Sequence, residues 1–175
     1  SAYGGITEFQ INKRGHVKVK KLNISNDTKL NLENNLLLFF TGFSRNSSLI
    51  LNEQNNKTIK QSTEIINNLD YVKKLGLEIK KNLIKGNCEE FGRLMHEHWK
   101  NKLKRSRKMS NSTIDNIYNF ALKNGALGGK LIGAGGGGFL LFYTNDPKRL
   151  RLAMKNKKIE EVNFKFDLDG VKQIF

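Results

Sequence analysis

The sequence predicts an α+β fold in which helices pack on one face of an antiparallel sheet. Short apolar or alternating runs, typical of strands, are mixed along the chain with longer segments of helical periodicity. The two kinds of segment do not alternate regularly, as they would in a parallel α/β sheet. The chain has 175 residues, with no internal repeat and no linker rich in Pro or Ser. We therefore expect one domain spanning residues 1–175.

Several segments are predicted to be strands. ITEFQI and HVKVKKL alternate in polarity on either side of residues 12–15, NKRG, which is a hairpin pattern with glycine in the turn. Residues 36–42, LLLFFTG, form a continuous apolar run that ends at glycine, as a buried strand does. Three later runs are also expected to be strands: FLLFY (139–143), VNFKF (162–166) and, after Gly170, VKQIF (171–175) as an edge strand.

Helical spacing of apolar residues begins near residue 48. Between residues 48 and 83 this spacing predicts one long helix or two. A further helix is expected to start at Asn87, whose side chain can cap it while Glu90 reaches back from the third helical position.

Two more helices are predicted in the second half of the chain. One is expected to start near Ser112, with Asp115 in the same capping relation, and to end at Asn124–Gly125. The other is expected to be short and to run from Pro147 to Leu152, because proline is favoured in the first turn of a helix.

The formal net charge of +15 comes mostly from lysine. Such an excess can indicate binding to nucleic acid or membranes, or the steering of anionic substrates. Asn is also abundant, and joint enrichment in Lys and Asn indicates a general compositional bias, with the lysines spread over all solvent-exposed faces. No basic segment carries the interleaved aromatic residues of a single-strand-binding groove. The run 100–108 is therefore interpreted as a solvated helix end, and nucleic acid is not the favoured partner.

The sequence shows no run of 18 or more apolar residues and no signal-peptide pattern, so we expect a soluble, cytoplasmic protein without a membrane partner. Cys88 is the only cysteine, which excludes an internal disulfide. His96 and His98 are two residues apart and do not share a helix face. We expect His98 near the core and His96 in solvent, and we predict no metal ligand in this chain.

The run Gly133–Gly138, GAGGGG, lies between two apolar segments. Glycine costs backbone entropy, so the run indicates either a flexible tether or a backbone that approaches a ligand closely. Strand formers follow at once, which disfavours a tether. A Walker A loop would end in Gly-Lys-Ser/Thr and be followed by a helix, and a dinucleotide-binding loop would also be followed by a helix. This run ends in Gly-Gly-Phe and leads into a predicted strand, so neither motif fits. The remaining prediction is a loop between two strands, with Lys130 just upstream, that faces an anion or a close substrate. A plain sheet corner would need only one or two glycines.

The segment Lys130–Gly138, KLIGAGGGG, closely resembles the third conserved motif of the GHMP small-molecule kinases. Residues 41–45, the helix from Ile114 to Gly125 leading into Gly129, and the opening residues 3–5 are similar to the sugar-phosphate branch, the D-glycero-D-manno-heptose 7-phosphate kinases. The resemblance covers nearly the whole chain but only the C-terminal half of such an enzyme. It implies the ferredoxin-like C-terminal domain of these kinases.

Two motifs of the family have no counterpart in this sequence. They are the nucleotide loop, Pro-x-Gly-Leu-Gly-Ser-Ser, and the Asp-Gln-Tyr segment with the catalytic Asp. The resemblance thus implies a kinase that phosphorylates a heptose 7-phosphate at its anomeric hydroxyl. It also implies that this chain contains no catalytic residue. We therefore expect the chain alone to be inactive. ATP and Mg²⁺ are expected to be held mainly by the N-terminal lobe, the partner of this domain.

Two other classes of function remain open. One is a non-catalytic binding or regulatory domain that retains the fold, and the other is a basic nucleic-acid-binding module. A lone half of a kinase would also expose the apolar surface that meets the other lobe, so a homo-oligomer is possible.

The resemblance places the contacts to substrate and phosphate mainly on the glycine loop, whose N–H groups are expected to donate to the ligand. Lys130 is expected to anchor this loop or to face the anion, and the alternative is a solvated lysine at a strand start. The loop residues are Gly133, Ala134, Gly135, Gly136 and Gly137.

Four further residues complete the candidate site. Arg45 is suited to a bidentate grip on a sugar phosphate, and its alternative is an ordinary ion pair. Thr41 is expected to bind a sugar hydroxyl unless it satisfies backbone groups at the strand end. Tyr3 and Gly4 are expected to border the sugar pocket.

Overall fold

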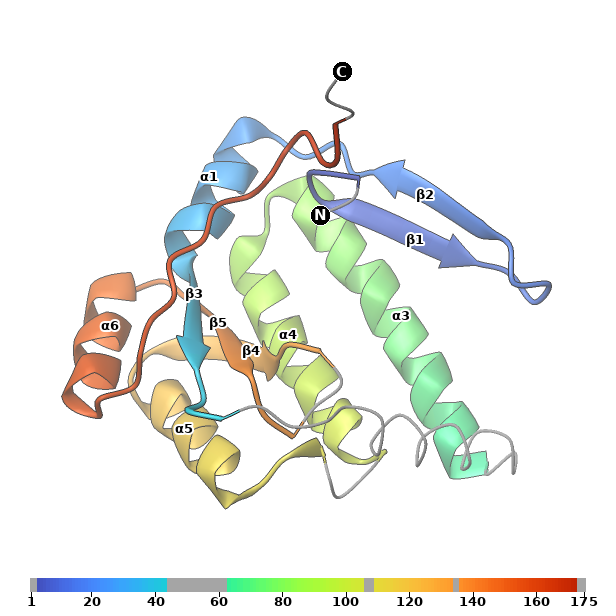
Figure 1. Cartoon of the computed structure of the whole chain (residues 1–175). Coiled ribbons are helices and arrows are strands. Elements are labelled where there is room, and N and C mark those ends of the chain that lie inside the picture. The colour runs from blue at the N-terminus through green and yellow to red at the C-terminus, as the bar shows by residue number, and fades with distance from the viewer. Residues whose placement is uncertain (1–2, 44–62, 106–108, 134–135, 173–175) are drawn as a thin grey trace.

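The computed structural model describes residues 3–43, 63–105, 109–133 and 136–172. The fold is α+β with antiparallel sheets, as predicted (Figure 1). In chain order its elements are β1 (Thr7–Ile11), β2 (Val17–Lys21), α1 (Asn26–Asn35), β3 (Leu36–Phe40), α3 (Thr63–Lys85), α4 (Cys88–Leu103), α5 (Ser112–Lys123), β4 (Ala126–Leu131), β5 (Phe139–Thr144) and α6 (Pro147–Asn156).

The strands form two separate antiparallel sheets. β1 and β2 make the predicted hairpin, with Thr7 opposite Lys21 and Ile11 opposite Val17. The larger sheet has the order β3-β5-β4. β5 is the central strand, and it joins two outer strands, β3 and β4, that are far apart in the sequence.

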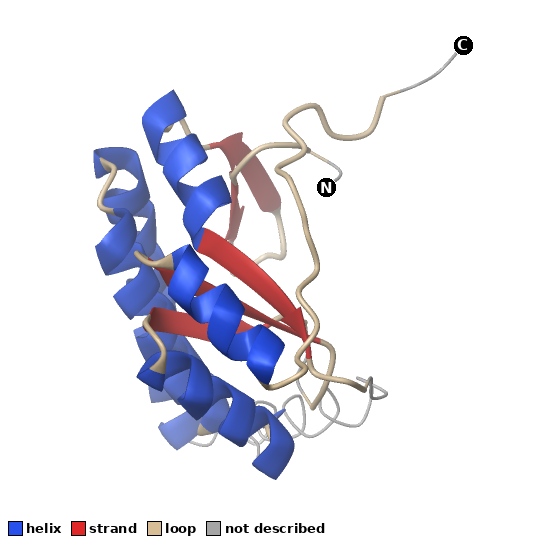
Figure 2. Cartoon of the chain, turned by 90° about the vertical axis from the view of Figure 1, so that its left-hand side faces the viewer, coloured by secondary structure: helices blue, strands red, loops and turns tan. Residues whose placement is uncertain are grey.

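The prediction of a strand at VNFKF was wrong. Only one bridge, between Phe39 and Glu161, joins this region to the sheet, and the Val162 N–H donates to the Leu38 carbonyl at 2.8 Å. The chain then leaves the edge of β3 and runs as a loop beside α1 (Figures 1 and 2), where the Phe166 N–H donates to Glu33. Residues 171–172 are not a strand either, and 173–175 lie outside the described residues.

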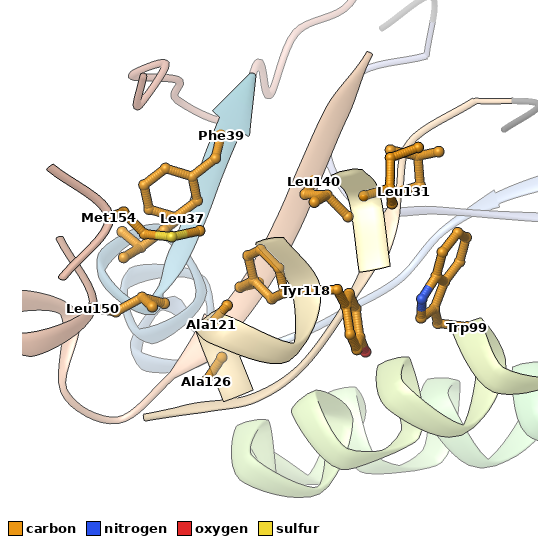
Figure 3. Close-up of a cluster of buried hydrophobic side chains, with 12 residues drawn as sticks. Leu37, Phe39, Trp99, Tyr118, Ala121, Ala126, Leu131, Leu140, Leu150 and Met154 are labelled. Carbon is orange, nitrogen blue, oxygen red and sulfur yellow. The ribbon is translucent and has the colours of Figure 1, made fainter. Parts of the chain in front are cut away.

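Two hydrophobic clusters fill the two faces of the larger sheet. On one face, α5 and α6 pack against Leu37, Phe39, Leu140 and Phe142 (Figure 3). On the other, Leu36 and Tyr143 pack with residues of α1, α3 and α4: Leu32, Leu83, Cys88 and Met95. The prediction of helices on one face therefore holds for α5 and α6, and α4 covers the opposite face.

Two of the predicted capping arrangements were wrong. Asn87 precedes α4 but makes no side-chain cap, because its amide donates to Asn82. Glu90 does not reach back but contacts Arg93. Asn111, not Ser112, caps α5 by accepting from the Ile114 N–H at 3.0 Å.

Other helix ends agree with the sequence. Asn124 and Gly125, which has a φ of +103°, follow the last residue of α5. α6 begins at Pro147 as predicted but extends beyond Leu152 to Asn156. Among the described helices, none has both the length and the apolar character needed to cross a membrane.

The contact between α4 and β4 depends on glycine at both surfaces. A Cβ atom on Gly128 would collide with the Gly92 carbonyl oxygen and lie 2.9 Å from the His96 Cβ. A Cβ atom on Gly92 would lie 2.6 Å from Cδ1 of Tyr143. The helix therefore rests directly on the strand, and its C-terminal half is carried toward the end of β4, where the glycine loop begins.

Candidate functional site

The glycine loop joins β4 to β5 and is held by backbone hydrogen bonds to neighbouring segments. The Gly136 N–H donates to the Met109 carbonyl and the Gly138 N–H to the Phe43 carbonyl, both at 2.9 Å. The expectation that loop N–H groups face a ligand was therefore wrong for Gly136, whose N–H is used inside the protein. Ala134 and Gly135 lie outside the described residues.

Thr41 ties the end of β3 to the base of this loop. Its side chain is buried, and its hydroxyl lies 2.9 Å from the Gly138 carbonyl and 3.0 Å from the Gly138 nitrogen. The backbone N–H of Thr41 also donates to the Gly138 carbonyl, at 2.8 Å. Of the two alternatives for Thr41, the structure shows the one in which the side chain satisfies backbone groups.

The two ends of the glycine loop differ in the space around them. Gly133 is exposed, has a φ of +84°, and has no heavy atom within 4 Å of the position where a Cβ would stand. At Gly137 a Cβ would lie 3.0 Å from the Phe43 ring and carbonyl. The open side of the loop, where a ligand can approach the backbone, is therefore at Gly133.

Lys102 anchors this open side. Its ammonium group donates to the Gly133 carbonyl at 2.6 Å, and the residue is only 8% exposed. The interpretation of residues 100–108 as a solvated helix end was therefore wrong for Lys102, although Lys100 and Lys104 are exposed. A signal was present, because Lys102 follows Met95 and Trp99 at the spacing of the buried helix stripe.

Lys130 lies across from Lys102 on β4. It is half-buried, and within the described part of the chain its ammonium group has neither a hydrogen-bond acceptor nor a carboxylate partner. Burial, with a smaller contribution from the charge of Arg105, lowers the pKa of Lys130. Burial also lowers the pKa of Lys102 to about 8, aided by the charges of Lys130 and Arg105.

His98 adds a neutral side chain to the same group. Burial, followed by the charges of Lys130, Arg105 and Lys102, lowers the pKa of His98 to about 4. Its Nδ1 is buried and has no hydrogen-bond partner in the described chain. Arg105 is itself held by Asn68 of α3, which accepts from the guanidinium Nε at 2.8 Å. The surroundings of Gly133 are therefore cationic.

The prediction that His96 lies in solvent was wrong. Its Nδ1 lies 2.9 Å from the Tyr118 hydroxyl, and the two rings stack with centroids 5.8 Å apart. The same hydroxyl donates to the Gly129 carbonyl at 3.0 Å and accepts from the Gly129 N–H at 3.2 Å. Tyr118 thereby covers the outer edge of β4. Among the described residues, no cluster of three or more His, Cys, Asp or Glu is placed to hold a metal ion.

The remaining candidates do not join the loop. Tyr3 packs edge-on against Phe9 of the hairpin, with ring centroids 5.7 Å apart. Gly4 is buried against residues 168–170. Arg45 lies outside the described residues.

Comparison with known proteins shows which family this arrangement resembles. Residues 79–160, from the end of α3 to the segment after α6, match the family model described as GHMP kinases C terminal. This part of the chain is therefore similar to the C-terminal domain of GHMP kinases.

Along most of its length the chain is also similar to sugar-phosphate kinases. It is 30% identical, over 98% of its length, to D-glycero-α-D-manno-heptose 7-phosphate kinase of Campylobacter jejuni, and it spans about half (51%) of that protein. Two solved structures share the fold. Mevalonate kinase of L. major has a TM-score of 0.73 at 16% identity, over 94% of this chain and 49% of that one. A D-glycero-D-manno-heptose 1-phosphate kinase of Bacteroides thetaiotaomicron has a TM-score of 0.64 at 24% identity, over 97% and 44%.

Proposed function

We propose that this chain is the C-terminal domain of an ATP-dependent kinase that phosphorylates D-glycero-D-manno-heptose 7-phosphate at the anomeric hydroxyl. The observation that carries the proposal is the open glycine at Gly133, together with the ammonium group of Lys130, which has neither a hydrogen-bond acceptor nor a carboxylate partner among the described residues. The similarity to a heptose 7-phosphate kinase along 98% of the chain supports the choice of substrate.

Phosphoryl transfer depends mainly on positioning and on neutralising the charge of the phosphate groups. In this proposal the backbone at Gly133 approaches the sugar phosphate, and Lys130 neutralises it. Thr41 and Gly136 hold the loop from behind. Ala134, Gly135 and Arg45 keep the contacts inferred from the family resemblance, whereas Tyr3 and Gly4 are left out because they contact the hairpin and the C-terminal segment.

ATP and Mg²⁺ would be held mainly by an N-terminal kinase lobe, the partner of this domain. The groups around Gly133 are ammonium, guanidinium and imidazole, which suit a phosphate group rather than a hard cation that prefers oxygen ligands. When bound, ATP supplies the transferred phosphoryl group. We propose a cytoplasmic location, where such a substrate and ATP meet.

An amide-resolved NMR titration at near-physiological salt tests this function. Heptose 7-phosphate is expected to shift the amides of Gly133 and its neighbours, while Mg-ATP and a short DNA duplex produce no localised change. Shifts spread over the surface lysines with DNA, and silence with the sugar phosphate, would instead favour the basic nucleic-acid-binding module.

A phosphoryl-transfer assay tests the division of labour. The chain alone, with Mg-ATP and heptose 7-phosphate, is expected to form no product. Product formation would contradict the proposal that the catalytic residues lie elsewhere. Binding of heptose 7-phosphate without transfer, even when a kinase N-terminal lobe is supplied, would favour the non-catalytic binding domain.

A further inference from the structure

The side chains around Gly133 contain more positive charge than the described chain can compensate. Lys102, which is 8% exposed, donates a hydrogen bond to the Gly133 carbonyl and to no other acceptor in the described chain. Lys130, which is half-buried, has no acceptor among the same residues. An ammonium group has three N–H donors, so most donors of these two lysines point to no acceptor among the described residues. Buried charges are ordinarily paired or hydrogen-bonded, because removing them from water is costly.

The two lysines come from separate elements that the fold brings together. In the register of the sheet, Gly128 and Lys130 pair with Tyr143 and Leu141 and so lie on the face of β4 that meets α4. Lys102 lies on the buried stripe of α4, one helical turn beyond Trp99. The close glycine contact at Gly128 therefore brings the end of α4 to the end of β4.

The charged and titratable groups that face Lys102 in the described chain include no acid. His98 and Arg105 come from the α4 segment, and Lys130 comes from β4. α3 contributes the neutral amide of Asn68, whose oxygen accepts a hydrogen bond from Arg105.

We propose that Lys102 and Lys130 form a subsite for a phosphate monoester dianion beside Gly133. This inference rests on the proposed function and adds to it a residue, Lys102, that contacts both the anion and the glycine loop. Lys102 keeps its bond to the Gly133 carbonyl while its remaining donors turn to the phosphate. The conformation of the loop and the occupation of the subsite are thereby linked through one side chain.

The chemistry recognised is a phosphate group, which either a sugar phosphate or a nucleotide can supply. Calorimetric titrations of the chain at pH 7.5 and constant ionic strength, with inorganic phosphate, heptose 7-phosphate and ADP, distinguish the two sources. Tighter binding of heptose 7-phosphate than of ADP would assign the subsite to the sugar substrate. The reverse order would assign it to the nucleotide, and the phosphate subsite itself would stand in both cases.

Matched variants separate a specific site from diffuse charge. Lys102→Met and Lys130→Met are each expected to weaken phosphate binding about 10-fold to 100-fold, which corresponds to one charge-assisted hydrogen bond. Lys104→Met removes the same charge from an exposed position on the same segment and is expected to change binding less than about twofold. Equal effects of Lys102→Met and Lys104→Met in folded proteins, or no binding of any of the three ligands to the unaltered chain, would overturn the subsite.

The dependence of binding on pH gives a second readout that a purely structural lysine would not affect. The anion binds the charged form of Lys102, whose pKa in the empty protein is about 8. Raising the pH from 7.5 to 9.5 should therefore weaken phosphate binding about 25-fold. Lys102→Arg, which stays charged, should flatten this profile, and an unchanged profile in that variant would count against the proposal. If heptose 7-phosphate, inorganic phosphate and ADP all bind normally to Lys102→Met, the subsite is overturned while the proposed function stands.

Discussion

The two halves of the contact between α4 and β4 are built differently. In the N-terminal half of the helix, Gly92 lies so close to Gly128 and Tyr143 that no side chain fits between them. In the C-terminal half, Lys102 and Lys130 stand opposite each other without a carboxylate among the described residues. One half is neutral and close-packed, and the other is cationic and opens toward the glycine loop.

The difference shows how a stable contact can support an unfavourable one. Like charges of buried lysines repel each other, and neither lysine gains a counter-ion from the described chain. Such an arrangement persists only if the surrounding structure holds it in place. The glycine contact provides this support, because Gly92 fixes the helix on the strand about three turns away from Lys102. Substitutions in the two halves should therefore have different effects on stability.

The largest effect is expected from Gly128→Ala. The added methyl group would collide with the Gly92 carbonyl and crowd His96, so helix and strand must separate. We expect a loss of about 3 kcal/mol in the free energy of unfolding, measured with urea. Gly76→Ala is the control, because a Cβ there meets nothing within 4 Å, and replacing a helical glycine should add up to about 1 kcal/mol. A Gly128→Ala protein as stable as the unaltered one would refute the close contact.

The next effect is expected from Tyr118→Phe, on the other side of β4. The substitution removes the hydroxyl that satisfies both backbone groups of Gly129 and the Nδ1 of His96. Buried polar groups that lose their partners cost about 1–3 kcal/mol, so we expect a loss of about 2 kcal/mol. Tyr71→Phe, on the exposed side of α3, should change stability by less than about 0.5 kcal/mol. Similar losses in both variants would mean that the hydroxyl of Tyr118 is not specifically bonded.

The sequence predicts an element of this structure well where neighbouring residues determine it. The β1–β2 hairpin and the end of α5 were predicted because turn residues lie directly beside these elements. α1 was not predicted, because only Thr28 and Leu32 of its residues are buried and its apolar pattern is weak. The continuous apolar runs of β3 and β5 indicate strands that are buried on both faces of the sheet. The predicted fold nevertheless placed helices on only one face.

The candidate site shows the same limit. The glycine loop was recognised because its composition is unusual in itself. Lys102 was not, because a lysine within a basic run is usually solvated, and its partner Gly133 lies 31 residues away in sequence. The spacing from Trp99 was the available signal, but a charged residue on a buried stripe becomes meaningful only when the opposing strand is known.

The pH dependence of stability tests the cationic half through His98. Because burial and nearby cations lower its pKa from 6.5 to about 4, the unfolded chain takes up a proton at a higher pH than the folded one. Stability is therefore lost as the pH falls from 6.5 toward 4. Between pH 7.5 and 5.5 this should amount to about 1 kcal/mol. The difference should shrink in His98→Gln and persist in His16→Gln, which alters an exposed residue of the hairpin turn. The same pH dependence in both variants would mean that His98 is not the group responsible.

The smallest effect on stability, and the one that separates the two halves most clearly, is expected from Lys102→Met. The substitution removes one hydrogen bond to Gly133 but also a buried charge that faces other cations, and these two changes oppose each other. Without added anions, the free energy of unfolding should be unchanged or higher by up to about 1 kcal/mol, as measured with urea at pH 7.5 beside the Lys104→Met control. Inorganic phosphate should then stabilise the unaltered chain and not the variant, because a ligand stabilises only the state that binds it. A variant that is clearly less stable in the absence of phosphate would mean that Lys102 is an ordinary structural residue, and that both halves of the contact between α4 and β4 stabilise the fold.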